Sequence, residues 1–152
     1  MILPKVSYEQ LTNETINVNG TSYVISHTIE GGRILSVNLN GQSKTLVISI
    51  KSTSNGNLVI DLPRILIDAK ENSSDTHYVV LANNHGVNFK ELVTADYRDL
   101  IIPFLNGTSA IEIKGTQVVP EFGSLIPLIL LASLLTIVGV SQKYKLLFYS
   151  KE

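Results

Sequence analysis

The chain has 152 residues, a formal net charge of −1 at pH 7 and no cysteine. This composition excludes disulfide bonds and thiol chemistry, and a slightly acidic chain without a basic aromatic patch argues against nucleic-acid binding. The length allows one domain of roughly a hundred residues with a hydrophobic core of its own.

Residues 1–18 form an N-terminal segment ahead of the first clear strand pattern. The opening MILPKVSYEQ lacks a basic stretch followed by an apolar one, so it does not resemble a signal peptide. A domain outside the cell needs export. We therefore expect segment 1–18 to be the remnant of a longer precursor, and the alternative is a protein without a signal that keeps its domain inside.

Apolar and polar residues alternate throughout residues 19–119. Leu35, Val37 and Leu39 share one side of a segment whose other side is polar, and the same period of two recurs along this region. Such alternation is typical of antiparallel strands with one buried and one solvated face. We expect strands at 23–29, 33–40, 44–51, 58–62, 77–82, 87–92 and 99–105, and around Ile111 and Ile113.

Turn signals separate these strands. Asn-Gly pairs occur at positions 19–20, 40–41, 55–56 and 106–107, and Gly31-Gly32 and Asn84-His85-Gly86 supply further turns. Pro63 is expected to end a strand, which makes 64–76 a longer crossover. The spacing predicts an all-β domain over 19–119, an antiparallel β-sandwich of immunoglobulin-like or similar Greek-key type, with a barrel as the open alternative.

Four asparagines stand in N-x-S/T sequons and are candidates for glycosylation. A sequon is used only where it is exposed in an exported protein, and three of the four fall in expected turns or in the crossover. The candidates are Asn13, Asn19, Asn72 and Asn106.

The sequence offers no catalytic constellation, and we expect neither a catalytic residue nor a cofactor. His27, His77 and His85 are too scattered for a metal site, and His27 shares a strand face with apolar residues and is expected to be packed. Asp96 and Asp99 with nearby Glu91 could supply calcium ligands, but no calcium-loop motif is present. The expectation is therefore that the protein binds no metal.

Arg64 is the polar residue of greatest interest outside the sequons. It follows Pro63 at the start of the expected crossover. We expect a structural ion pair with Asp61 or Asp68 that fixes this segment.

The C-terminal region contains an uncharged apolar run from residue 122 to 142, closed by Lys143 and Lys145. About 20 helical residues match the roughly 30 Å hydrocarbon core of a bilayer, so we expect a transmembrane helix at 124–142. Lysine-rich flanks stay on the cytoplasmic side, which places the tail 143–152 inside and the N-terminal domain outside.

The segment Val119-Pro120-Glu121-Phe122-Gly123, followed by an apolar helix and a basic end, resembles the PEFG-CTERM sorting signals of archaeal surface proteins. The resemblance implies that Pro120, Glu121, Phe122 and Gly123 form a processing motif for an archaeosortase, a membrane cysteine transpeptidase. That enzyme would transfer the domain to a lipid-type anchor. The basic end consists of lysines and not of an arginine cluster as in those signals, and seven further residues follow it. Whether the tail is cleaved or retained is therefore left open.

The sequence is compatible with two functions. The first is a non-enzymatic protein of the cell surface that displays its β-sandwich, with membrane lipid, the processing enzyme and other envelope proteins or glycans as partners. The second is an extracellular binding module for a carbohydrate or a metal ion on a retained membrane anchor. Tyr97 is the one aromatic residue expected in a loop, where a sugar could stack.

Overall fold

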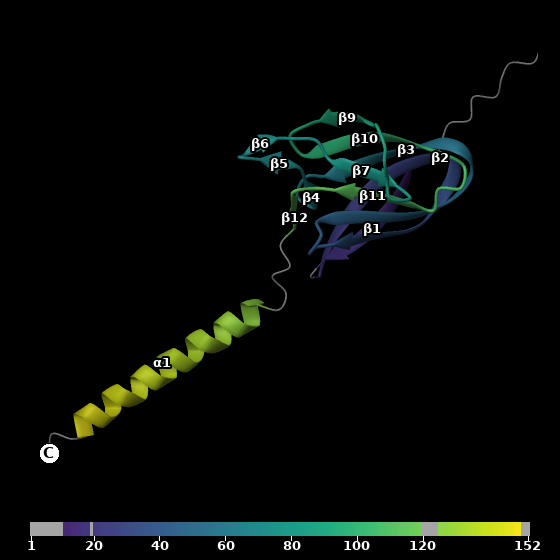
Figure 1. The fold of residues 1–152 in the computed structure, drawn as a ribbon. Helices are drawn as coiled ribbons and strands as arrows, with labels where there is room; N and C mark the ends of the chain where they lie inside the picture. The colour runs from purple at the N-terminus through teal and green to yellow at the C-terminus, as the bar shows by residue number, and fades with distance from the viewer. Residues whose placement is uncertain (1–10, 19, 120–124, 150–152) are drawn as a thin grey trace, which may run out of the picture. The chain divides into compact units, whose positions relative to one another are not determined.

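The chain divides into two units, Met1–Pro120 and Glu121–Glu152. The computed structural model describes residues 11–18, 20–119 and 125–149, with helix side chains described for 129–142. The first unit is built of antiparallel strands and the second contains a helix, and each is described by itself (Figure 1).

Three antiparallel strands in succession form the framework of the β unit. They are β1 (Thr12–Val18), β2 (Thr21–Asn40) and β3 (Thr45–Pro63). The sheet thus begins within segment 1–18, ahead of the predicted boundary at residue 19, because all seven residues of β1 pair in register with β2.

Two predicted turns are absent, because β2 and β3 are continuous strands of 20 and 19 residues. Gly31-Gly32 and Asn55-Gly56 lie inside these strands, where the β2–β3 register shifts between Glu30 and Gly32. A Cβ on Gly56 would lie 1.8 Å from the carbonyl oxygen of Glu30. The glycines therefore allow two backbones to approach at a β-bulge and do not reverse the chain.

The remaining strands are short. The crossover predicted at 64–76 contains three two-residue strands, and six more strands follow it. They are β4 (Ile67–Asp68), β5 (Lys70–Glu71), β6 (Ser74–Asp75), β7 (Val79–Ala82), β8 (His85–Gly86), β9 (Lys90–Val93), β10 (Tyr97–Phe104), β11 (Ala110–Lys114) and β12 (Gln117–Val118).

The irregularity in β2 and β3 divides the large sheet into two halves. In one half, residues 26–30 of β2 pair with 57–61 of β3, β1 pairs outside β2, and β10 and β9 follow β3. In the other half, residues 32–40 of β2 pair with 45–52 of β3, and β11, β7 and β8 follow. All these pairings are antiparallel, which confirms the predicted all-β class.

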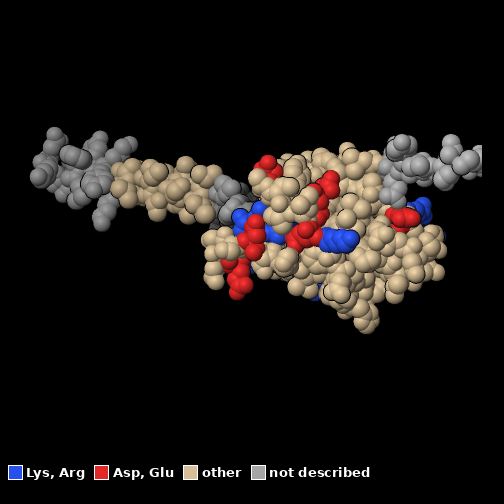
Figure 2. All heavy atoms as spheres, turned by 90° about the horizontal axis from the view of Figure 1, so that it is seen from above, with Lys and Arg blue, Asp and Glu red and all other residues tan. Residues whose placement is uncertain are grey.

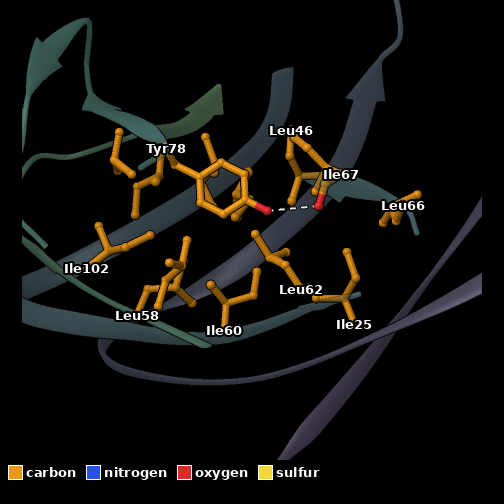
Figure 3. Packing of buried hydrophobic residues seen from close by; sticks show 14 of the residues in the cluster. Ile25, Leu46, Leu58, Ile60, Leu62, Leu66, Ile67, Tyr78 and Ile102 are labelled. Carbon is orange, nitrogen blue, oxygen red and sulfur yellow. Dashed lines mark hydrogen bonds between the residues drawn. The ribbon is translucent and has the colours of Figure 1, made fainter. Parts of the chain in front are cut away.

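Both halves contribute alternate side chains to a single core. Leu58, Ile60 and Leu62 of β3 are fully buried, and so are Leu46 and Ile48 from the other end of the same strand. Figure 3 shows Leu46 and the three β3 residues at 58, 60 and 62 around the ring of Tyr78. The hydroxyl of Tyr78 donates a 2.8 Å hydrogen bond to the carbonyl oxygen of Ile67. The two-residue period of the sequence therefore identifies the buried face of β3 correctly. In β2 it fails at Leu35, which is 57% exposed while Ile34 packs against the core, because the β2–β3 register shifts between Ile34 and Ser36.

The second unit contains α1 (Leu125–Tyr149), a helix of 25 residues that runs past the predicted end at residue 142. Among the described residues, no helix combines the length and the apolar character that a membrane crossing requires. The transmembrane helix predicted at 124–142 is therefore not confirmed.

Candidate functional site

Arg98 in β10 is the most unusual side chain of the β unit, because it is charged and fully buried. It lies on the same face of its strand as Leu100 and Ile102, and it pairs with Leu62 of β3 and Val93 of β9. A buried guanidinium is strongly destabilising unless every N–H group finds an acceptor and the charge is compensated. Its surroundings therefore decide whether this end of the fold is stable.

Arg98 donates five hydrogen bonds, which use all the N–H groups that a guanidinium has. Its Nε binds Asp68 at 2.7 Å, and its Nη1 binds Glu91 at 2.8 Å and the carbonyl oxygen of Thr76 at 2.7 Å. Its Nη2 binds the carbonyl oxygen of Ala69 at 2.6 Å and Asp75 at 3.2 Å. The guanidinium carbon also lies 5.2 Å from the ring centroid of Tyr78, within cation–π range.

Arg64 joins the same carboxylates from the outer side. Its Nε binds Asp68 at 3.1 Å, its two terminal nitrogens bind Asp75, and Nη1 also donates to the carbonyl oxygen of Thr94 at 2.9 Å. The predicted pair with Asp68 is confirmed, whereas the alternative partner Asp61 is not among these contacts. Lys70 adds a third cation, with its Nζ 3.5 Å from Asp68.

We call these six residues the arginine cluster: Arg64, Asp68, Lys70, Asp75, Glu91 and Arg98. Burial alone would raise the pKa of Asp68, but the N–H of Ala69 and the two arginines outweigh burial and lower it. The pKa of Arg98 is raised, because hydrogen bonding to Glu91 and the nearby carboxylates overcome the opposing effect of burial. The lowered pKa of Asp68 and the raised pKa of Arg98 both favour the ion pair between these two side chains.

The arginine cluster connects segments that are distant in sequence. Asp68 and Asp75 belong to the crossover, Glu91 to β9 and Arg98 to β10. In the view of Figure 2, acidic and basic side chains lie side by side and do not form separate areas of one sign. Because the carboxylates are already bound by arginines, the cluster acts as a structural clamp and presents no free set of ligands.

The carboxylates considered for calcium do not converge. Glu91 is engaged by Arg98, and Asp99 of β10 faces Asp61 across the β3–β10 pairing. Burial, and secondarily the charge of Asp99, raise the pKa of Asp61. Within the described residues, no group of three or more His, Cys, Asp or Glu side chains could hold a metal ion.

The three histidines occupy unrelated positions. His27 in β2 is packed as predicted, with 5% of its surface exposed and no hydrogen-bond partner for either ring nitrogen among the described residues. Burial lowers its pKa, against an opposing effect of Glu14. His77 is exposed with Nδ1 2.8 Å from Glu91, and His85 is exposed in β8.

The sequons differ in their surroundings. Asn13 is exposed in β1, where its side-chain oxygen accepts a 2.9 Å bond from Ser26, and Asn72 is exposed at the β5–β6 turn. Asn106 is exposed between β10 and β11, but Thr108 of its sequon is buried, with 6% exposed. Asn19 and the sorting motif Pro120, Glu121, Phe122 and Gly123 lie outside the described residues.

A groove of about 610 Å³ lies between the β7–β8 and β10–β11 turns. Val87, Pro103 and Leu105 give it an apolar lining, and Asn88 adds an amide. The amide of Asn83 also lines the groove but is bound to Gly107, Ser109 and Ala110. Tyr97, the aromatic loop candidate, lies in β10 and lines a different hollow beside Arg64. The structure therefore does not bring Tyr97 to the groove.

Comparison with known proteins yields no relative: no family model, curated protein or solved structure matches this chain. Arg98 was not predicted from the sequence as a buried residue, although it continues the alternation of Leu100, Ile102 and Phe104 backwards into the core. Its position on the buried face of β10 was the available signal, because a buried arginine needs carboxylates and hydrogen-bond acceptors within the fold.

Proposed function

We propose that the chain is a non-enzymatic protein of the cell surface. Its β unit is displayed outside the cell, and its C-terminal region is a sorting signal of the PEFG-CTERM type. The observation that carries the proposal is the order of features in the sequence: the motif at 120–123, the uncharged run that ends at residue 142, and Lys143 with Lys145. Its role is structural or adhesive within the envelope.

The β unit suits display. We infer a β-sandwich of Greek-key type, because side chains from both halves of the large sheet share one core. The charged residues of the arginine cluster bind one another, which favours a structural role over catalysis. A fold stabilised by packing and ion pairs, without cysteines, is independent of the redox conditions outside the cell.

The described part of α1 supports an anchoring role. Its large apolar side chains are all exposed, interrupted by Ser133, Thr136 and Ser141, and so many exposed apolar groups favour an apolar environment. They are Ile129, Leu130, Leu131, Leu134, Leu135, Ile137, Val138 and Val140. Lipid is the proposed environment, with the lysine-containing tail on the cytoplasmic side.

Two measurements test the proposal: the location of the chain in the cell and its intact mass. Cell fractionation and labelling with a membrane-impermeant reagent should recover the β unit at the surface, and intact-mass measurement should show loss of everything beyond residues 120–123. A surface protein that still carries Glu152 would show that the tail is retained as an anchor. A chain recovered free in the cytosol would contradict surface display itself.

A second function, carbohydrate binding, is favoured by the groove at the β7–β8 and β10–β11 turns. Apolar residues with nearby amides can contact the faces and hydroxyl groups of a sugar. Calorimetry against a panel of glycans, with Leu105→Ala as the groove variant and Leu92→Ala as the matched control on exposed β9, would test it. An absence of binding across the panel would leave structural display as the function.

A further inference from the structure

The β5–β6 hairpin presents an exposed sequon at its tip. Lys70 pairs with Asp75 and Glu71 pairs with Ser74, so Asn72 and Ser73 form a two-residue loop. Both loop residues have positive φ, 50° at Asn72 and 68° at Ser73, as a type I′ turn requires. Asn72, Ser73 and Ser74 are all exposed, so the amide and the hydroxyl of the sequon both face solvent.

The base of this hairpin is firmly held although its tip is open. Asp75 is bound by Arg64 and Arg98, and the N–H of Thr76 donates to the carbonyl oxygen of Ala69 at 3.0 Å. On the other strand, Lys70 exchanges two 2.7 Å hydrogen bonds with the hydroxyl of Thr116. β5 and β6 lie at one end of the β unit in Figure 1, where they project from the remaining strands.

The sequon at Asn106 is less accessible. Its Thr108 is buried, and the backbone N–H groups of Asn106 and Gly107 are held at 2.8 Å by the side chains of Asn55 and Ser52. A transferase that must reach both the amide and the hydroxyl would have to open this loop first.

The sequon at Asn13 is constrained in a different way. Asn13 lies within β1, paired opposite Ser26, and its side-chain oxygen accepts the Ser26 hydroxyl bond. Glycosylation there would require the amide to leave this contact while its backbone remains in the strand. Of the three described sequons, the one at Asn72 alone combines an exposed amide, an exposed hydroxyl and a turn outside the large sheet.

We propose that Asn72 is the preferred N-glycosylation site among the described sequons, an inference that depends on the proposed surface display. The donor is a sugar activated as a lipid-linked phosphate. The Asn72 Nδ2 attacks the anomeric carbon, a C–N bond replaces the C–O bond to phosphate, the phosphate leaves with the electron pair, and Nδ2 loses one proton. The sugar then projects from a rigid hairpin without entering the core.

The test is site-resolved mass spectrometry on the full chain, expressed in a host that glycosylates exported proteins. Asn72→Gln and Ser74→Ala should each lose one glycan mass, and Ser74→Ala leaves the turn residues unchanged. Two controls should keep that mass: Ser73→Gly, which retains the sequon and suits a positive φ, and Asn106→Gln.

Surface exposure is measured separately with the impermeant label, which distinguishes the two proposals. If the chain is at the surface and Asn72 is unmodified, or if Asn13 or Asn106 carries more sugar, the preference for Asn72 is wrong while display stands. If the chain never reaches the surface, display fails and this inference fails with it.

Discussion

The middle of the β unit and its crossover end both bury large side chains, but those in the middle are apolar and the one at the crossover end is charged. In the middle, Ile48, Ile60 and Leu100 are fully buried and need only close contact with other apolar groups. At the crossover end, Arg98 is equally buried but requires five acceptors and compensating charges. Apolar packing tolerates small changes in shape, whereas a buried ion network depends on every partner.

The sharpest test of this difference is Arg98→Met, which removes the buried cation and leaves Asp68 and Glu91 without it. We expect a loss of about 3–5 kcal/mol in the free energy of unfolding, because the buried carboxylate of Glu91 loses its arginine and the carbonyl oxygens of Thr76 and Ala69 lose their donor. Urea unfolding of the full chain, followed by tyrosine fluorescence, measures it.

Arg64→Met is the matched comparison at the same carboxylates. Arg64 is partly exposed and its removal leaves Arg98 bound to Asp68 and Asp75, so a clearly smaller loss is expected. Equal losses in the two variants would show that burial of Arg98 is not what makes the crossover end sensitive.

The second prediction concerns the close approach of β2 and β3. Gly56→Ala places a Cβ against the backbone of Glu30, so the strands must separate, and we expect a loss of about 1–3 kcal/mol. In Gly86→Ala the new Cβ meets nothing within 4 Å, and stability should change by less than about 0.5 kcal/mol. Hydrogen exchange of the β2–β3 amides would show whether the separation is local. An unaffected Gly56→Ala variant would contradict the close approach.

These glycines also show how far the sequence alone can predict the fold. The Asn40-Gly41 and Asn106-Gly107 pairs do lie in chain reversals, with Gly107 at a φ of 91°. Asn55-Gly56 is the same dipeptide but lies inside a strand. Glycine is required at position 56 because the backbone of Glu30 lies against it. That contact depends on the register of two long strands, which no local pattern encodes.

The candidate site was less predictable than the core. Alternation identifies the buried side chains of β3, β10 and β11, because every second residue of these strands points into the core. The arginine cluster instead joins Asp68, Asp75, Glu91 and Arg98 from separate segments, and only the crossover geometry brings them together. The pair of Arg64 with Asp68 was predictable because the two are four residues apart.

The third prediction examines the apolar middle. Ile60→Val removes one methylene from a fully buried side chain, and we expect a loss of about 0.5–1.5 kcal/mol in the free energy of unfolding. Ile101→Val on neighbouring β10 makes the same change where 43% of the residue is exposed, so its effect should be smaller. A loss as large as that of Arg98→Met would remove the contrast between the two regions.

The smallest effect is expected from His27, which places a titratable group inside the apolar part of the fold. Burial lowers its pKa below the ordinary value of 6.5, so the folded state favours the neutral ring. Well above pH 6.5 neither state binds the proton, and stability is unaffected. As the pH falls below 6.5, the unfolded chain takes up the proton first, so stability decreases.

His27→Phe should therefore flatten the change in urea midpoint between pH 7.5 and pH 5.5, a range chosen to lie about one unit on either side of the ordinary histidine pKa. Glu14 is the charged group that opposes the shift, so Glu14→Gln should steepen the same dependence. His85→Phe serves as the control, because that ring is exposed on β8, away from the buried core. If the midpoint of the parent chain does not decrease on acidification, His27 must find a partner for its proton inside the fold, and the apolar part of the core would then share the chemistry of the crossover end.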